Sequence, residues 1–267
     1  MTRDNRRRGT EFEDSVSSLE MMRLGIIEKI GFFHCVDFGL PAHPIAKLRE
    51  EIETKIHKEK QRDQTWDISN SLLVLPEAFN IGQYDPRSEP QQPASTFLES
   101  LRELAAQHRV ILVSGILDGR RNSAYLIDAK VAHLMCHKIG DDLTGIYDPC
   151  TGDPDPCNPI TFRNACVGAL ICLDAATDAP HQPHIRQRLE DFVKRLSLHE
   201  GKKIVCVPGR FRFPRNLDCC SQMTDCWYIM AQGTYTGESR GSFIADSSHK
   251  KVAEAIDANE VKIWRLP

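Results

Sequence analysis

The sequence predicts one α/β domain in which two β-sheets are covered on the outside by helices. Two observations lead to this prediction: several short apolar runs have the length of fully buried strands, and helical patterns separate some of them. The runs are residues 72–75, 110–113, 167–171 and 204–207. A chain of 267 residues can bury a large core, and no repeat, low-complexity tract or obvious linker divides it.

Apolar residues spaced three or four positions apart predict the helices. We expect helices from about Ser17 to Ile30, from Pro44 to Ile56, from a cap at Thr96 and Glu99, and from Pro183 onward. Strand-like segments are expected at residues 32–36, and as strand pairs within residues 122–137 and 241–257. Residues 1–29 are taken as an N-terminal extension with one helix, residues 30–267 as the domain, and residues 147–159 as an irregular loop.

Charge and hydropathy argue against several classes of function. The formal net charge of -3 leaves no basic footprint for nucleic acid. We find no apolar run of the roughly 18–20 residues that a membrane span needs, and the arginines near the N-terminus precede no apolar signal segment. The expected location is therefore the cytoplasm.

Ten cysteines are the most unusual feature of the composition. In a reducing compartment such residues are usually buried side chains, metal ligands or nucleophiles rather than disulfides. Cys35, Cys136, Cys166 and Cys206 lie in or beside strand-like runs and are expected in the core.

Three chemically distinct side chains lie where predicted strands end. Glu77 follows the run 72–75, Lys138 follows the segment 132–137, and Cys172 follows the run 167–171. Ligands of open α/β sheets gather at the carboxyl ends of the strands, so these side chains form a candidate nucleophile site. Taken singly, each has an ordinary explanation: a core thiol, a solvated loop carboxylate and a surface ammonium.

Together these three residues could hydrolyse a carbonyl or nitrile substrate. A free thiol is only partly ionised at neutral pH, so Cys172 needs a base, and a carboxylate such as Glu77 becomes more basic when buried. Lys138, with a backbone N–H such as that of Leu173, would stabilise the oxyanion of the tetrahedral intermediate. Loss of the amine would leave a thioester, which water would then hydrolyse.

These segments resemble motifs of the nitrilase (carbon–nitrogen hydrolase) superfamily. Residues 71–79 (SLLVLPEAF) are similar to its strand and Pro-Glu motif, and residues 168–174 (GALICLD) to its nucleophile motif. Residues 122–128 (NSAYLID), followed by His137 and Lys138, are similar to the strand pair that leads to its lysine. Residues 231–234 (AQGT) and 241–255 resemble its late strand and closing hairpin, so the likeness runs from about residue 30 to 258.

The resemblance implies a four-layer α-β-β-α sandwich, commonly paired into a homodimer. It also implies hydrolysis or transfer at a non-peptide C–N bond of a small amide, carbamoyl or nitrile substrate, with Glu77, Lys138 and Cys172 as the triad and no cofactor. An amidase is favoured over a nitrilase. The chain departs from the pattern after Cys172, where the typical Phe-Pro-Glu segment is missing.

A second glutamate found in many members has no clear equivalent in this chain. Asp148, Asp153 or Asp155 could replace it, although an aspartate is one methylene shorter. Arg210 or Arg212 could bind a substrate carboxylate through a planar fork, or could pack on the surface as most arginines do. His181 and His184 lack a third ligand with convincing spacing and fit a polar loop better than a metal site.

Two other functions compete with the hydrolase. One is a binding or regulatory protein that keeps the fold with weak or no catalysis. The other is a metal or redox module, although its cysteines lack the paired C-x2-C spacing of a zinc site. The cysteines of that module would be Cys150, Cys157, Cys219, Cys220 and Cys226.

Overall fold

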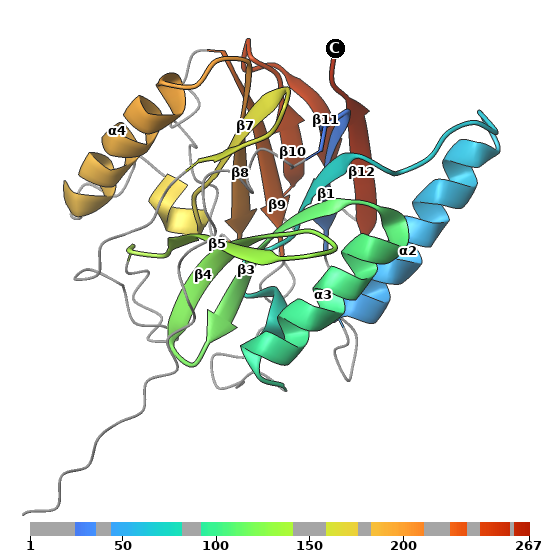
Figure 1. The fold of residues 1–267 in the computed structure, drawn as a ribbon, viewed down its shortest axis with the longest axis horizontal. Coiled ribbons are helices and arrows are strands. Elements are labelled where there is room, and N and C mark those ends of the chain that lie inside the picture. The colour runs from blue at the N-terminus through green and yellow to red at the C-terminus, as the bar shows by residue number, and fades with distance from the viewer. Residues whose placement is uncertain are drawn as a thin grey trace, which may run out of the picture.

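A computed structural model describes residues 25–35, 44–81, 92–140, 159–175, 183–210, 225–233, 241–256 and 259–267. It contains two six-stranded sheets packed face to face with helices on both outer sides (Figure 1). The predicted α/β class and the four-layer sandwich are thus confirmed.

The first sheet has the strand order β12-β1-β2-β3-β4-β5. Strands β1, β2 and β3 run parallel, and the remaining neighbours pair antiparallel. The bounds are β1 Lys29–His34, β2 Ser71–Val74, β3 Ile111–Asp118, β4 Arg121–Ile127, β5 Ala132–His137 and β12 Glu260–Arg265.

The second sheet has the strand order β11-β10-β9-β8-β7-β6, with β7, β8 and β9 parallel. The bounds are β6 Ile160–Thr161, β7 Ala165–Ala169, β8 Lys202–Gly209, β9 Cys226–Gln232, β10 Ser242–Ala245 and β11 Lys251–Ala255. The four apolar runs of the sequence lie in or directly beside β2, β3, β7 and β8, and their residues are buried as predicted except for Ile111, which is half-buried.

Helices α2 (Pro44–Lys60) and α3 (Ala94–His108) cover the first sheet, and α4 (Pro183–Ser197) covers the second (Figure 1). Two 3-10 turns follow strand ends: η1 (Phe79–Ile81) and η2 (Cys172–Ala175). The prediction that Thr96 caps α3 was wrong. The carbonyl of Pro93 already accepts the N–H of Phe97, so the helix begins at Ala94 and Thr96 lies inside its first turn.

The expectation that a helix runs to Ile30 was also wrong at its end. Residues 25–28 are irregular, and Ile30 belongs to β1, which pairs with both β2 and β12. Ile27 and Ile30 are fully buried, because their side chains pack into the core between the sheets. The earlier part of that helix, the loop 147–159 and the N-terminal stretch before residue 25 lie outside the described residues.

Buried apolar residues form two large clusters and one small one among the described residues. The first large cluster fills the space between the sheets and includes the buried face of α4, and the second lies between the first sheet and the helices α2 and α3. The small cluster consists of Ala78, Ile81 and Leu117. Cys35, Cys136, Cys166 and Cys206 are buried in the core, as predicted.

A buried histidine connects the two sheets. Nε2 of His34 lies 3.0 Å from the carbonyl oxygen of Ile256, which can only accept, so Nε2 carries the hydrogen. Nδ1 of His34 then accepts from the hydroxyl of Ser242 at 2.8 Å, and that hydroxyl oxygen accepts the N–H of Gln232 at 2.7 Å. This chain links β1 of the first sheet to β9 and β10 of the second.

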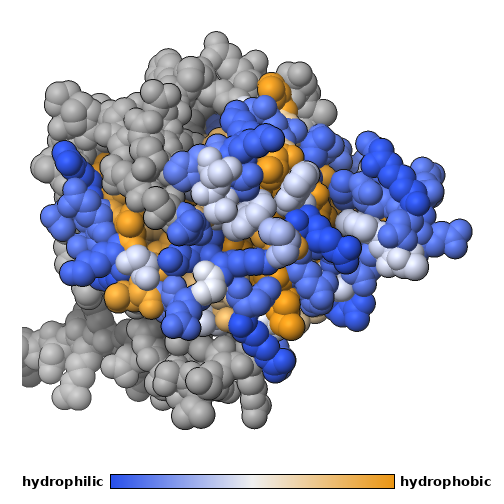
Figure 2. Space-filling model, turned by 90° about the horizontal axis from the view of Figure 1, so that it is seen from above, coloured by the Kyte–Doolittle hydropathy of each residue, from blue (hydrophilic) through white to orange (hydrophobic). Residues whose placement is uncertain are grey.

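Among the described helices, none has the length and apolar character required to cross a membrane. One face of the molecule is mainly hydrophilic, with apolar side chains showing as separate small patches (Figure 2).

Candidate active site

The two sheets bring Glu77, Lys138 and Cys172 together. Glu77 follows β2, Lys138 follows β5 and Cys172 begins η2 after β7, so each residue lies just beyond the carboxyl end of a strand. Nζ of Lys138 donates a hydrogen bond to Oε1 of Glu77 at 2.6 Å. Their side chains are 0% and 5% exposed, so this is a buried, charge-assisted contact.

Glu77 is held by several neighbours. Nδ2 of Asn122, a residue at the start of β4, donates to Oε1 of Glu77 at 2.7 Å. The backbone N–H of Lys138 donates to the carbonyl of Asn122 at 2.8 Å, so one residue contacts both members of the ion pair. On β3, a Cβ added to Gly115 would lie only 2.9 Å from Cα of Glu77. Glycine is therefore required there by the close approach of the glutamate backbone.

Cys172 has a strained backbone and a neutral thiol. Its φ of 47° lies in the left-handed region, and Ala78, next to Glu77, has a φ of 48°. Such conformations in non-glycine residues persist where the surrounding structure enforces them and cluster at functional sites. Burial, then the charge of Glu77 and a hydrogen bond to it, raise the pKa of the Cys172 thiol, whereas Lys138 and the backbone N–H of Arg210 lower it.

A buried carboxylate, Asp174, joins the nucleophile turn to the lysine segment. Its oxygens accept the backbone N–H groups of Ile139 at 3.0 Å and Gly140 at 2.7 Å, the two residues after Lys138. Arg188 of α4 donates to the same carboxylate at 2.7 Å. Burial raises the pKa of Asp174, and Arg188 is the strongest influence that lowers it again.

Among the other predicted site residues, the structure describes Arg210, Leu173 and Cys226. Arg210 directly follows β8 and is buried, with its backbone N–H at the thiol of Cys172. The backbone of Leu173 forms part of η2. Cys226 of the metal-module hypothesis is buried in β9. The candidates outside the described residues are Arg212, Asp148, Asp153, Asp155, His181, Cys150, Cys157, Cys219 and Cys220.

Sequence reasoning did not assign a site role to Asn122, Asp174 or Arg188. Asn122 and Asp174 were present in the motifs but had no predicted partner. Arg188 belongs to a helix whose approach to the nucleophile turn depends on packing. Within the described residues, no group of three His, Cys, Asp or Glu side chains is arranged to hold a metal ion.

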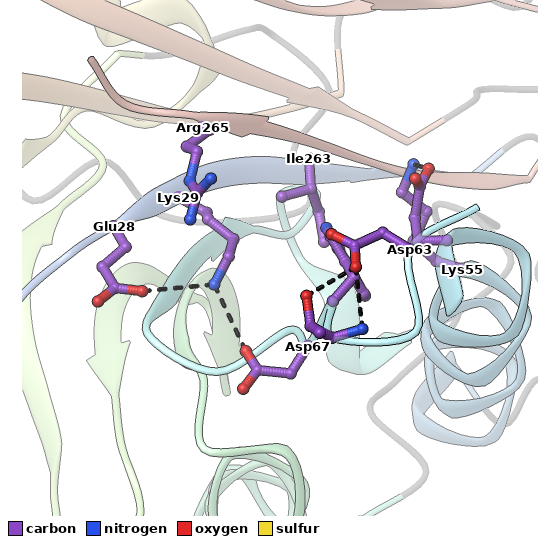
Figure 3. A pocket seen from close by; sticks show the side chains of 10 residues that line it. Glu28, Lys29, Lys55, Asp63, Asp67, Ile263 and Arg265 are labelled. Atoms are coloured by element: carbon purple, nitrogen blue, oxygen red, sulfur yellow. Dashed lines mark hydrogen bonds and ion pairs between the residues drawn. The ribbon is translucent and has the colours of Figure 1, made fainter. Parts of the chain in front are cut away.

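A cavity of about 430 Å³ lies at the other end of the first sheet (Figure 3). It is lined by charged side chains near the start of β1, whereas Glu77 follows the carboxyl end of the parallel strand β2. Lys29 lies 3.6 Å from Glu28 and 3.5 Å from Asp67, so its ammonium is already neutralised. This cavity is separate from the candidate catalytic residues.

Solved structures of the same shape include an amidase from Nesterenkonia sp. Its crystal structure aligns with a TM-score of 0.61 over 91% of both chains, at 14% sequence identity. A form of that amidase in complex with acrylamide aligns with a TM-score of 0.60 over 90% of both chains, also at 14% identity. The amidase is described as belonging to the nitrilase superfamily. The chain has the nitrilase fold.

Comparison of the sequence with known families and proteins assigns the chain to no family. No protein-family model matches the chain, and no curated protein matches it significantly in sequence. Another solved form of the Nesterenkonia amidase, with a Glu-to-Gln substitution, carries acrylamide added to its active-site cysteine. That form aligns with a TM-score of 0.59 at 14% identity, covering 90% of this chain and 93% of the amidase.

Proposed function

We propose that this protein hydrolyses a small amide through a thioester on Cys172, with Glu77 as the general base and Lys138 as the oxyanion stabiliser. The observation that carries the proposal is the buried contact of 2.6 Å between Lys138 and Glu77, beside a thiol that is hydrogen-bonded to the same glutamate. The Nesterenkonia amidase, which has the same fold and an active-site cysteine, supports this reaction class.

Acylation begins with a protonated thiol, because burial and Glu77 both raise the pKa of Cys172. As Sγ attacks the carbonyl carbon, Glu77 takes the thiol proton and the carbonyl electrons move onto oxygen. The ammonium of Lys138 stabilises this oxyanion together with the backbone N–H of Leu173. Glu77 then passes its proton to the substrate nitrogen, the C–N bond breaks, and ammonia leaves.

Deacylation reverses the roles with water in place of the thiol. Glu77 takes a proton from water as its oxygen attacks the thioester, and the C–S bond breaks. The proton returns to the sulfur, so one amide and one water yield one carboxylic acid and one ammonia. Because Lys138 and Asn122 both bond to Oε1 of Glu77, the second carboxylate oxygen is left to exchange these protons.

Arg210 and Arg212 are the candidate groups for binding a substrate carboxylate. A guanidinium recognises a carboxylate through two parallel hydrogen bonds. The position of Arg210, directly after β8 and with its backbone N–H at Cys172, supports a role near the reacting carbon. Faster turnover of ω-amido acids than of uncharged amides would support this role.

Ammonia release from a panel of simple amides, ω-amido acids, N-carbamoyl compounds and nitriles tests the proposal. We expect turnover that disappears in Cys172→Ala and persists in Cys206→Ala, which removes another buried thiol of the core. Absence of turnover across the panel would instead favour the binding or regulatory protein. Turnover of nitriles in preference to amides would contradict the amidase.

A further inference from the structure

Asn122 carries a buried hydrogen-bond acceptor directly beside the proposed general base. The residue is 1% exposed, and its Nδ2 donates to Oε1 of Glu77 at 2.7 Å. In the described part of the chain, its Oδ1 is buried and has no hydrogen-bond partner. The asparagine therefore uses one half of its amide and leaves the other half without a donor.

The contact with Glu77 fixes the orientation of this amide. An ionised carboxylate can only accept hydrogen bonds, so the nitrogen must face Glu77 and the oxygen must be the unpaired atom. Ser123 of β4 pairs with His137 of β5, and the two strands are antiparallel. Asn122, which precedes Ser123, therefore lies opposite Lys138, which follows His137. Oδ1 thus belongs to the cluster of groups around the Glu77 carboxylate.

Leaving a buried acceptor without a donor costs about 1–3 kcal/mol, and native proteins keep few such groups. Asn80 shows the usual arrangement. It is 4% exposed, and both its amide oxygen and its amide nitrogen are bonded to the backbone of Leu117 at 2.8 and 2.7 Å. Unlike Asn80, Asn122 therefore has an amide oxygen that can accept a hydrogen bond from a bound molecule.

We propose that Oδ1 of Asn122 accepts an N–H of the substrate nitrogen, and that Asn122 thereby selects substrates with an N–H at the reacting carbon. This inference rests on the proposed function. The departing nitrogen must come next to Glu77 to receive its proton, and its own N–H groups need an acceptor at the same place. Primary amides and carbamoyl groups supply such a donor, whereas esters and nitriles do not.

The test compares substrates that differ only in this donor. For Asn122→Ala we measure kcat/KM for propionamide and for methyl propionate. Loss of the Nδ2 contact to Glu77 should slow both substrates, whereas loss of Oδ1 should affect the amide alone. We expect the amide-to-ester ratio to fall about tenfold, the value of one hydrogen bond to a neutral acceptor. Asn122→Ser, with a smaller loss of volume, should shift the ratio in the same direction and serves if the alanine variant fails to fold.

A matched control is Asn80→Ala, which removes a buried asparagine whose amide is hydrogen-bonded to Leu117. It should lower stability and leave the ratio unchanged. An equal loss for amide and ester in Asn122→Ala, or an equal shift of the ratio in Asn80→Ala, would overturn the inference.

Binding to an inactive variant separates this inference from the proposed function, because it needs no turnover. We measure the Kd of propionamide and of methyl propionate for Cys172→Ala, with and without the additional substitution Asn122→Ala. The preference for the amide should fall about tenfold when Asn122 is replaced. If no amide is hydrolysed by the unmodified protein but this preference falls, the hydrolase proposal fails and the role of Asn122 stands. An unchanged preference would refute the role of Asn122 whether or not amides are hydrolysed.

Discussion

Arg188 and Asp174 form an ion pair in which Nη1 of the arginine lies 2.7 Å from Oδ2 of the aspartate, and their side chains are 7% and 0% exposed. The same carboxylate accepts the two backbone N–H groups that follow Lys138. Through this carboxylate, an arginine from α4 supports the nucleophile turn and the lysine segment together.

Replacing Arg188 should destabilise the protein strongly. Removing one partner of a buried ion pair leaves an uncompensated charge and typically costs about 3–5 kcal/mol. Burial already raises the pKa of Asp174, so loss of Arg188 should raise it further and protonate one of the acceptors of Ile139 and Gly140. We expect Arg188→Met to lower the midpoint of urea unfolding and to reduce kcat.

The control substitution is at Arg186, on the same helix α4. Arg186→Met breaks an exposed pair with Glu190, at side-chain exposures of 82% and 52%, and should change stability by less than about 1 kcal/mol. Equal effects of the two substitutions would contradict a special role for the buried pair.

Substitutions of Lys138 and Glu77 should move the pH profile of Cys172 in opposite directions. Burial raises the pKa of the thiol most, Glu77 raises it further by charge and hydrogen bond, and Lys138 lowers it. Alkylation follows the thiolate, so its rate rises as pH passes through this pKa. Lys138→Met should shift the alkylation midpoint to higher pH, and Glu77→Gln should shift it to lower pH, while both abolish amide hydrolysis.

The measurement is the rate of iodoacetamide labelling of Cys172, followed by mass spectrometry over a range of pH. Shifts in the same direction for both substitutions would contradict the arrangement of charges around Cys172.

Gly115→Ala should impair catalysis through Glu77. The added methyl group would meet Cα of Glu77 at 2.9 Å and the backbone N of Ala78 at 3.2 Å, and neither backbone atom can move without displacing the glutamate. We expect kcat to fall at least tenfold, a size of loss that follows from a small misplacement of a reacting group. Gly25→Ala, where the added methyl group meets nothing within 4 Å, should leave kcat unchanged.

Labelling should also distinguish Cys172 from the core thiols of the second sheet. Burial is the main cause that raises the pKa of Cys166 and of Cys226 to about 11, and burial alone raises that of Cys206. Burial raises the pKa of all four thiols, so all are protonated at pH 8, but the thiol of Cys172 is hydrogen-bonded to Glu77, which can take its proton as the sulfur attacks. We expect iodoacetamide to modify Cys172 well before the other three in the folded protein, and all four at similar rates in denaturant.

The positions of Glu77, Lys138 and Cys172 could be predicted because each follows a segment whose sequence is strand-like. Strands that enter a sheet in parallel direct their carboxyl ends to one edge, so residues at those ends converge whatever their separation in the sequence. Strand length and apolar composition are local properties, and they were sufficient to locate β2, β5 and β7.

The start of β1 could not be predicted in the same way. Ile26 and Ile30 have helical spacing, yet Ile30 lies in a strand because β2 and β12 supply its backbone partners. A local period of four residues cannot reveal a sheet whose neighbouring strands begin at residues 71 and 260.

The sequence by itself determined the α/β class, the strands that carry the candidate triad, and the order of its three residues, since these follow from local apolar patterns and from what comes after them. Only the tertiary structure decided which groups hold the triad in place. Asn122 reaches Glu77 across 45 positions, and Asp174 reaches Gly140 across 34. Such contacts depend on the register of β4 with β5 and on the packing of the two sheets against each other, and neither is encoded in a local pattern.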